Sequence, residues 1–262
     1  MSAHPTAIVS PAARLGPRVS LGPYAVVEEE TEIGEGTEVR AHAVVKRYTS
    51  LGAGNTVHEG AVLGGEPQDL SFQPGPTRLV IGDRNRIREG VTIHRGSRPE
   101  SATVVGSDCF LMAYAHVAHD DRIGDQAILA NNVILAGHVE VGAQAFLSGG
   151  VGVHQFCRIG RLAMIGGNSK VVQDCLPFVI TDGVPGRARG VNVVGLRRAG
   201  IAASQLRALK EGYRLLLRSG LRLEIALEGM AALQDPLVDE MAAFVRDARR
   251  GFARAARGAP QE

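Results

Sequence analysis

Aliphatic side chains recur at every sixth position along most of the chain. Starting at Val9, ten positions spaced six residues apart are all Val, Ile or Leu, ending at Leu63. The spacing resumes at Ile81 and, after a second break, runs from Val105 to Val171. A period of six fits neither the 3.6-residue period of a helix nor strand alternation, and it is typical of hexapeptide repeats.

A second column of small residues accompanies the aliphatic one. Four residues after each aliphatic position the side chain is usually small, as at Ala25, which follows Leu21. The three cysteines all occupy this column: Cys109, Cys157 and Cys175. We therefore expect them to be small buried hydrophobes rather than nucleophiles. Their odd number and unpaired spacing also argue against a disulfide framework.

These columns predict an all-β solenoid followed by α-helices. Three short strands would form a triangular coil of about 18 residues, with one aliphatic side chain per side pointing inward and coils stacked as parallel strands. We expect this parallel β-helix to span residues 1–190, with loops projecting near 64–80 and 97–104. The first loop contains Gly, Pro, Gln and Asp, and long excursions from a regular scaffold often carry function.

The spacing of apolar residues becomes helical after the repeats end near Pro177. The segment 191–262 is expected to be a small C-terminal helical domain with three amphipathic helices. Their apolar positions are Leu206, Leu209, Tyr213 and Leu216 in the first, Leu223, Leu227 and Met230 in the second, and Leu237, Met241, Phe244 and Val245 in the third.

Composition restricts the class of protein. Aromatic residues make up 4% of the 262 residues and tryptophan is absent, so the core must be aliphatic. The net charge of +2 gives no reason to expect nucleic acid as a partner. The sequence has no run of 18 apolar residues and no evident signal peptide, so we expect a cytoplasmic protein without an integral membrane segment.

Four of the eight histidines lie between positions 116 and 154. With 18 residues per coil, His119 lies above position 137 and beside His138, and His138 lies above position 156, close to His154. His116 is on the strand before His119. None of the four occupies an inward column, so we expect a functional cluster at one edge of the column rather than scattered surface histidines.

Two kinds of chemistry suit such a cluster. Imidazole titrates near neutral pH, so His119 could act as a general base with Asp120 orienting its ring. Alternatively, three neutral imidazoles could bind zinc, with ligands shared between subunits. The spacing of the residues leaves both possibilities open.

Six segments resemble the UDP-N-acetylglucosamine acyltransferases of lipid A biosynthesis. They are "QDLSF", "IGDRNRIREGVTIHRG", "AHVAHDDRIG", "ILANNVILAGHVEVG", "VHQFCRIG" and "GVNVVGLRRAG". The resemblance implies a homotrimer of left-handed parallel β-helices with its active site between neighbouring subunits. It implies transfer of an (R)-3-hydroxyacyl group from acyl carrier protein to the glucosamine 3-hydroxyl of the UDP-sugar, with no cofactor and no metal.

The resemblance also implies roles for individual residues. His119 would be the general base, Asp120 would orient it, and the Gly137 N–H would stabilise the developing oxyanion. Sugar and acyl contacts would come from His116, His138, His154 and Gln155. The other side of the nucleotide-sugar site would be formed by Gln68, Asp69 and His94. Uracil and phosphate contacts would come from Asn192 and Arg198. Gly167 would set the acyl-chain length, and its lack of a side chain would favour a longer chain.

Three positions depart from the family pattern. Ser71 replaces a lysine, Val194 a glutamate and Ala199 a second arginine. These losses leave open a 3-amino sugar nucleotide as acceptor, a different nucleotide contact or weaker binding. A zinc-dependent hydratase on the same fold is a separate alternative, based on the histidine cluster. Five C-terminal arginines could form a landing surface for the acidic carrier protein, namely Arg246, Arg249, Arg250, Arg254 and Arg257.

Overall fold

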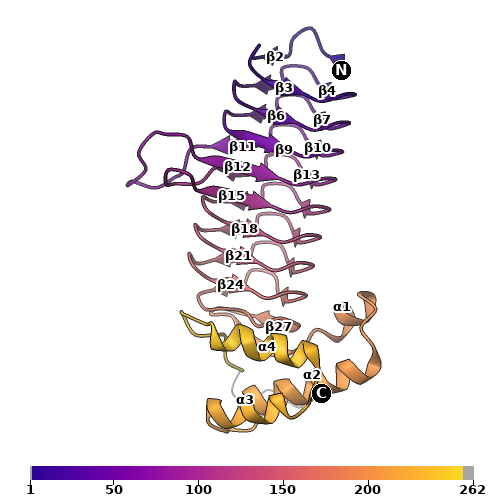
Figure 1. Ribbon diagram of the computed structural model, residues 1–262, viewed down its shortest axis with the longest axis vertical. Helices are drawn as coiled ribbons and strands as arrows, with labels where there is room; N and C mark the ends of the chain where they lie inside the picture. The colour runs from indigo at the N-terminus through magenta and orange to yellow at the C-terminus, as the bar shows by residue number, and fades with distance from the viewer. Residues whose placement is uncertain (1, 256–262) are drawn as a thin grey trace.

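The protein is described by a computed structural model covering residues 2–255. The chain winds into a left-handed parallel β-helix, a three-sided column capped at one end by helices (Figure 1). The strands form three sheets, here called A, B and C, and each turn of the chain visits A, then B, then C. The predicted fold class is confirmed.

The strands of each sheet are short and follow one another at intervals of one coil. Sheet A contains β1 (Ser2–Ala3), β4 (Ser20–Leu21), β7 (Glu38–Val39), β10 (Thr56–Val57), β13 (Arg86–Ile87), β16 (Phe110–Leu111), β19 (Ile128–Leu129), β22 (Phe146–Leu147), β25 (Met164–Ile165), β27 (Val179–Asp182) and β28 (Arg187–Val191). Sheet B contains β2 (Ile8–Val9), β5 (Val26–Val27), β8 (Val44–Val45), β11 (Val62–Gly65), β14 (Thr92–His94), β17 (His116–Val117), β20 (Ile134–Leu135), β23 (Gly152–Val153) and β26 (Lys170–Val171). Sheet C contains β3 (Arg14–Leu15), β6 (Glu32–Ile33), β9 (Thr49–Leu51), β12 (Arg78–Ile81), β15 (Ala102–Val105), β18 (Arg122–Ile123), β21 (Glu140–Val141) and β24 (Arg158–Ile159).

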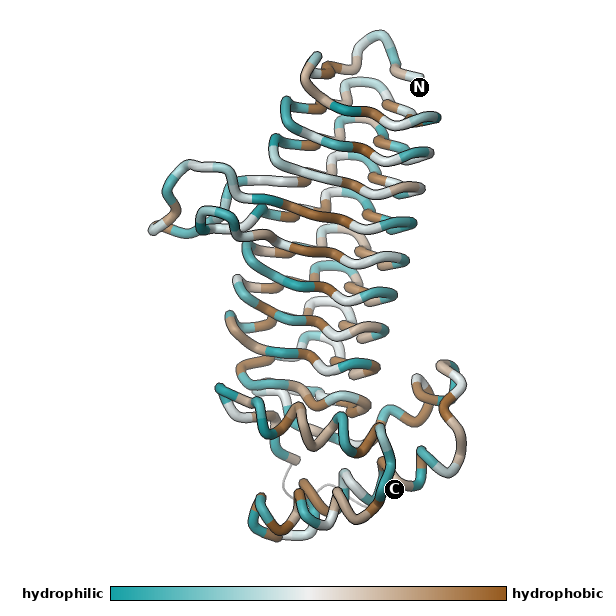
Figure 2. The backbone as a smooth tube through the Cα atoms, viewed as in Figure 1, coloured by the Kyte–Doolittle hydropathy of each residue, from teal (hydrophilic) through white to brown (hydrophobic). Residues whose placement is uncertain are grey.

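The aliphatic residues that recur at every sixth position form the core of the β-helix. In sheet A, Leu129 pairs with Leu111 on one side and Leu147 on the other, and all three side chains are fully buried. Apolar segments therefore recur at equivalent places on successive coils (Figure 2). Cys109, Cys157 and Cys175 are buried and free, as predicted, and burial raises the pKa of the Cys175 thiol to about 12.

Both loops leave the column at the edge between sheets B and C, which we call the B–C corner. The first lies between β11 and β12, and the second between β14 and β15. Both are shorter than the sequence suggests, because residues 64–65, 78–80 and 102–104 belong to strands. These strands lengthen to four residues and pair with adjacent coils, burying Leu79.

The C-terminal helices cap the column and have their own core. They are α1 (Val193–Arg198), α2 (Ala203–Leu217), α3 (Leu223–Ala231) and α4 (Pro236–Arg246). The last three correspond to the predicted helices, whereas α1, which follows the antiparallel pair β27 and β28, was not predicted. Within residues 2–255, no helix is long and apolar enough to cross a membrane.

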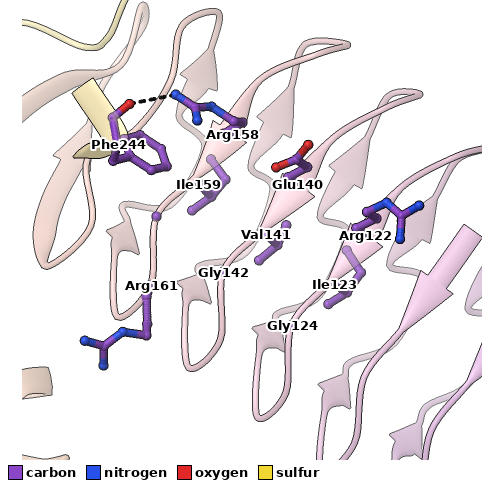
Figure 3. A pocket seen from close by; sticks show the side chains of 11 residues that line it. Arg122, Ile123, Gly124, Glu140, Val141, Gly142, Arg158, Ile159, Arg161 and Phe244 are labelled. Carbon is purple, nitrogen blue, oxygen red and sulfur yellow. Dashed lines mark hydrogen bonds between the residues drawn. The ribbon is translucent and has the colours of Figure 1, made fainter. Parts of the chain in front are cut away.

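Two arginines of the last coil fasten α4 to the column. The Arg158 guanidinium donates to the Phe244 carbonyl oxygen at 2.8 Å and lies 4.2 Å from the centre of the Phe244 ring (Figure 3). Arg161 pairs with Glu240 at 2.7 Å. The helical cap is thereby held in a fixed position against sheet C.

The stacked core makes a direct prediction about stability. Replacing Leu129 with alanine removes a fully buried side chain from the middle of a stack and leaves a cavity, which should cost about 2–5 kcal/mol. We expect a clearly lower thermal midpoint than for the wild type. Arg122→Ala, at an exposed position on the neighbouring β18, should change the midpoint little; equal effects of the two substitutions would contradict the stacked core.

Candidate active site

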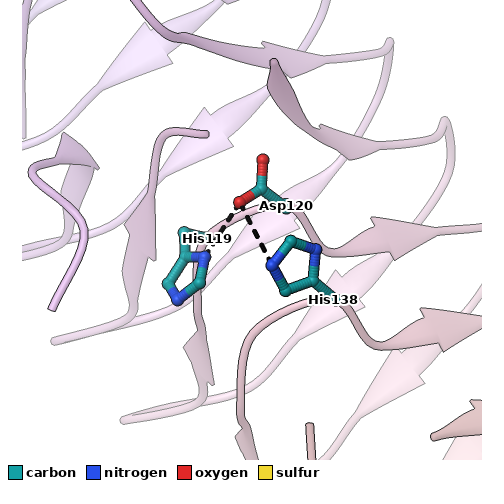
Figure 4. Close-up of side chains that lie close together, drawn as sticks. All are labelled: His119, Asp120 and His138. Atoms are coloured by element: carbon teal, nitrogen blue, oxygen red, sulfur yellow. Dashed lines mark hydrogen bonds and ion pairs between the residues drawn. The ribbon is translucent and has the colours of Figure 1, made fainter. Parts of the chain in front are cut away.

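The B–C corner brings together three side chains from two successive coils. His119 and Asp120 follow β17, and His138 occupies the same place as Asp120 one coil later. The Oδ2 atom of Asp120 lies 2.9 Å from His119 Nδ1 and 3.7 Å from His138 Nε2 (Figure 4). The two imidazole rings meet edge to face, with centroids 5.2 Å apart. The prediction that His119 and His138 share one edge is confirmed.

The second loop holds the Asp120 carboxylate in place. The Ser97 hydroxyl donates to Oδ2 at 2.6 Å, and the Ser97 N–H donates to the same oxygen at 3.1 Å. The Asp120 N–H donates to the Thr103 hydroxyl oxygen at 2.8 Å. Burial opposes ionisation, but hydrogen bonds from Ser101, Ser97 and His119 outweigh it and lower the pKa of Asp120 to about 2. Asp120 therefore carries a negative charge at neutral pH.

This charge determines how His119 is oriented. A carboxylate only accepts hydrogen bonds, so Nδ1 of His119 carries the proton that points at Asp120. Nε2 is then left with a free lone pair in the neutral ring. The ring lies over Gly137, where a Cβ atom would come within 2.7 Å of Nε2. Glycine at 137 thus leaves room for the imidazole, and its own N–H donates to no group among residues 2–255.

Two further histidines line the same corner. The His94 and His116 rings meet edge to face with centroids 4.9 Å apart, and His116 Nδ1 lies 2.7 Å from the Thr92 hydroxyl. Burial lowers the pKa of His116, and it lowers the pKa of His94 to about 4. Burial also lowers the pKa of His138. These rings are neutral at physiological pH and can both donate and accept hydrogen bonds.

The first loop brings a second carboxylate towards the cluster. Asp69 accepts hydrogen bonds from the Ser71 N–H and hydroxyl, both at 2.8 Å, and these bonds lower the pKa of Asp69. His119 and His138 lower it further, since both are close enough to act through charge. Gln68 is exposed beside Asp69. Asp69 therefore lies near His119 and His138, while His94 contacts His116.

One coil further along, the corner is open to solvent. His154 and Gln155 are both exposed, and His154 Nδ1 lies 3.0 Å from the Gln155 carbonyl oxygen, its one hydrogen-bond partner within residues 2–255. Phe156 stacks on His138 with centroids 4.6 Å apart. The structure thus places His154 and Gln155 at the expected corner but outside the hydrogen-bonded cluster.

Three predicted site residues lie elsewhere in the single chain. Gly167 is in the turn between sheets A and B, where a Cβ atom would find its nearest neighbour 3.4 Å away. Asn192 caps α1 by accepting from the Gly195 N–H and also donates to the Leu162 carbonyl oxygen. Arg198 is exposed at the end of α1, and this helix lies on the opposite side of the molecule from the first loop (Figure 1).

The sequence reasoning missed residues that support the cluster. Ser97 in the second loop and Thr103 on β15 fix Asp120, and neither was predicted, although both fall within the range 97–104 expected for that loop. Asp121 was also missed. It is fully buried in the small-residue column, where its carboxylate accepts from the Ala118 and Val139 N–H groups at 3.0 and 2.7 Å. The sequence does carry a signal for Asp121, because it places an acidic residue in the column of small residues.

The alternative function considered for this cluster is metal binding. His119, Asp120 and His138 each offer a ligand atom, and these atoms lie within 4.8 Å of one another. However, Asp120 already accepts from Ser97, and its Oδ2 also faces His119 Nδ1. A metal bound between them would have to displace these hydrogen bonds, so the arrangement fits a histidine–carboxylate pair better.

Comparison with known proteins identifies the family. A sequence model described as "Udp N-acetylglucosamine O-acyltransferase; Domain 2" matches residues 174–253. A Paraburkholderia phymatum protein named acyl-(acyl-carrier-protein)–UDP-N-acetylglucosamine O-acyltransferase is 47% identical over 258 residues, covering 96% of this chain and 98% of its own. The chain belongs to the UDP-N-acetylglucosamine O-acyltransferase family. The resemblance seen in the sequence is confirmed.

Other members of the UDP-N-acetylglucosamine O-acyltransferase family agree in sequence and in fold. The protein of the same name from Verminephrobacter eiseniae is 46% identical over 231 residues, which is 88% of each chain. The crystal structure of UDP-N-acetylglucosamine O-acyltransferase from Moraxella catarrhalis superposes with a TM-score of 0.94 at 39% identity, covering 97% of this chain and all of the other.

The buried, neutral His94 predicts how stability depends on pH. Its folded pKa of about 4 lies below the ordinary value of 6.5, so protons bind more tightly to the unfolded chain. Stability should be fully present above pH 6.5 and decline as the pH falls towards 4. Thermal midpoints measured across this range should fall less steeply for His94→Gln than for the wild type. Identical slopes would contradict this account, and Asp120 does not interfere because it titrates at lower pH.

Proposed function

We propose that this protein transfers an (R)-3-hydroxyacyl group from acyl carrier protein to the glucosamine 3-hydroxyl of UDP-N-acetylglucosamine, the first step of lipid A biosynthesis. The observation that carries the proposal is the pairing of His119 with an ionised Asp120 above the unhindered backbone of Gly137, in a chain of this enzyme family. Such an arrangement suits general-base catalysis of acyl transfer.

The proposed reaction uses the groups of the corner in a definite order. The free lone pair of His119 Nε2 takes the proton of the sugar 3-hydroxyl as its oxygen attacks the thioester carbonyl carbon. Asp120 stabilises the resulting imidazolium, and the Gly137 N–H donates to the oxyanion, a contribution of about 3 kcal/mol. The carbon–sulfur bond then breaks, and the carrier's thiol leaves with the proton from His119.

The departures from the family pattern bear on the acceptor. Ser71, in place of a lysine, uses its hydroxyl to bind Asp69 and brings no positive charge to the loop. Val194 is 60% exposed on α1, and Ala199 directly follows that helix. With fewer charged groups for the nucleotide, a 3-amino sugar nucleotide remains the alternative acceptor.

The outward faces of the three sheets support assembly into a homotrimer. Sheet C carries mainly charged residues on its outer face, at Arg14, Glu32, Arg122, Glu140 and Arg158. Sheet A is apolar towards its C-terminal end, at Phe110, Ile128, Phe146, Met164 and Ile180. Sheet B is largely apolar, at Ile8, Val26, Val44, Val62 and Ile134. A ring of three copies would bury sheets A and B against one another and leave sheet C in water.

This packing would complete the active site. If sheet B of one copy packs on sheet A of the next, the B–C corner with His119 faces residues of the neighbouring copy. Within one chain the same residues lie far from this corner. Gly167, beside sheet A, would then lie along the acyl group. Asn192 and Arg198, after sheet A, would reach the nucleotide of the neighbouring copy.

The acyl carrier protein has an accessible route to the corner. A groove of about 1220 Å³ extends from Asp120 and His138 along sheet C to Arg246, Arg249 and Arg250. These cations would attract an acidic carrier and orient its thioester arm towards His119. Arg254 lies nearby in sequence, and Arg257 lies outside the described residues. A carrier and sugar nucleotide of this kind, together with three free thiols, fit a cytoplasmic enzyme.

Replacing His119 with alanine tests the proposal. Without its general base the enzyme should lose activity by a factor of at least about 100, while binding of UDP-N-acetylglucosamine stays within a few-fold of the wild type. Acyl transfer is followed by mass spectrometry of the product from a mixed acyl-carrier pool. The product mass also distinguishes an ester from an amide and gives the acyl length.

Two controls separate the competing interpretations. Activity lost on treatment with a chelator and restored by zinc would favour the hydratase alternative. Binding of the sugar nucleotide by a wild type that transfers no acyl group would indicate a binding module instead. His119→Ala with full transferase activity would contradict the proposed role of this residue.

A further inference from the structure

The first loop has little internal structure to fix its position. It projects from the column between β11 and β12 (Figure 1). The hydrogen bonds formed within it are local, between Asp69 and Ser71, from the Phe72 N–H to the Asp69 carbonyl oxygen, and from the Thr77 N–H to the Gly75 carbonyl oxygen. The position of Asp69 near His119 and His138 must therefore be set by contacts where the loop joins the column.

One guanidinium makes most of these contacts. Arg95 is only 3% exposed and follows His94 at the start of the second loop. On the entering side of the first loop it donates to the Gly64 carbonyl oxygen at 3.4 Å and pairs with Glu66 at 3.1 Å. On the leaving side its Nε donates to the Thr77 hydroxyl at 3.1 Å. Arg95 thus ties the two ends of the loop together.

The same side chain also contacts the body of the loop. Its Cζ atom lies 5.6 Å from the centre of the Phe72 ring in the loop and 5.6 Å from that of Tyr48 on the preceding coil. A planar guanidinium can satisfy three hydrogen-bond acceptors and lie against two rings at once, which a lysine ammonium cannot reproduce. Burial of this charge with a mostly exposed Glu66 is stabilising only while these partners are in place.

The backbone beside Arg95 aligns the loop with the catalytic corner. The Arg95 N–H donates to the Gly65 carbonyl oxygen at 3.0 Å. The His94 ring covers Gly65 so closely that a Cβ atom there would come 3.0 Å from His94 Cδ2. The start of the loop is therefore in contact with the ring that packs on His116.

We propose that Arg95 is a positioning residue that holds the 66–77 loop over the site and so determines affinity for the nucleotide sugar. This inference rests on the proposed function, because the loop is taken to bind that substrate through Gln68 and Asp69. Arg95 touches neither substrate nor the reacting atoms. Its loss should weaken sugar-nucleotide binding and leave the acyl-transfer step itself largely intact.

Steady-state kinetics of Arg95→Met and Arg95→Lys provide the test. We expect Arg95→Met to raise KM for UDP-N-acetylglucosamine about tenfold or more, with kcat within about threefold of the wild type, and Arg95→Lys to fall between them. Arg78→Met is the matched control, since Arg78 borders the same loop but is exposed and forms no side-chain hydrogen bond within residues 2–255. It should leave both parameters unchanged.

Chymotrypsin cleavage of the loop gives a second readout that does not require activity. Leu70 is fully exposed and Phe72 is half-buried, so cleavage after either residue should be faster in Arg95→Met than in the wild type. If Arg95→Met fails to fold, Phe72→Ala removes the loop's ring while leaving the guanidinium, and it too should raise KM.

Each outcome bears on a separate claim. A folded Arg95→Met with wild-type KM and wild-type cleavage would overturn the role of Arg95, as would a Phe72→Ala variant with unchanged KM. A loss of kcat with unchanged KM would also overturn it. A wild type without acyl-transfer activity would refute the proposed function, while faster cleavage of Arg95→Met would still support the anchoring of the loop.

Discussion

The stacking of one aliphatic side chain in every six inside the column is the constraint on which the structure depends. It fixes the length of each coil, since a residue gained or lost within a side would turn an inward side chain outward. Residues one coil apart are therefore held side by side at the strand spacing of about 4.8 Å. His119 over Gly137, and Asp120 beside His138, are consequences of this spacing. The geometry of the proposed catalytic site follows from the packing of the core.

Longer excursions are accommodated only where they leave the stacked positions undisturbed. Both loops leave the column at the B–C corner, between strands of sheets B and C. The first brings Asp69 towards His119 and His138, and the second supplies Ser97 to Asp120. Ionised Asp120 lies 3.7 Å from His138, and burial lowers the pKa of His138 as it does those of His94 and His116 at the same corner.

The sequence predicted the features that repeat and missed those that depend on a single contact. The six-residue period was sufficient to predict the parallel β-helix, the buried cysteines and the shared edge of His119 and His138. It could not predict α1, which is six residues long and depends on the Asn192 cap. The C-terminal boundary of each loop was predicted too late because strand pairing extends β12 and β15 beyond the regular two residues.

The roles of Ser97 and Asp121 also required coordinates. Ser97 meets Asp120 across 23 positions of sequence through a loop whose path has no periodicity. Asp121 lies in a column otherwise filled by small apolar or hydroxyl side chains, where backbone N–H groups from two coils satisfy its carboxylate. Asn192, Arg198 and Gly167 lie away from the histidine cluster in one chain, which is the expected result if neighbouring copies share each site.

Subunit mixing tests the central claim, that a corner of one copy and the far side of the next form a single site. His119→Ala and Arg198→Ala chains, each expected to be far less active than the wild type, are unfolded, mixed in equal amounts and refolded together. In trimers assembled at random from the two chains, about one site in four combines an intact His119 with an intact Arg198 from the neighbouring copy. If sites form between copies, about a quarter of wild-type activity should therefore return. A mixture no more active than its parents would contradict the account.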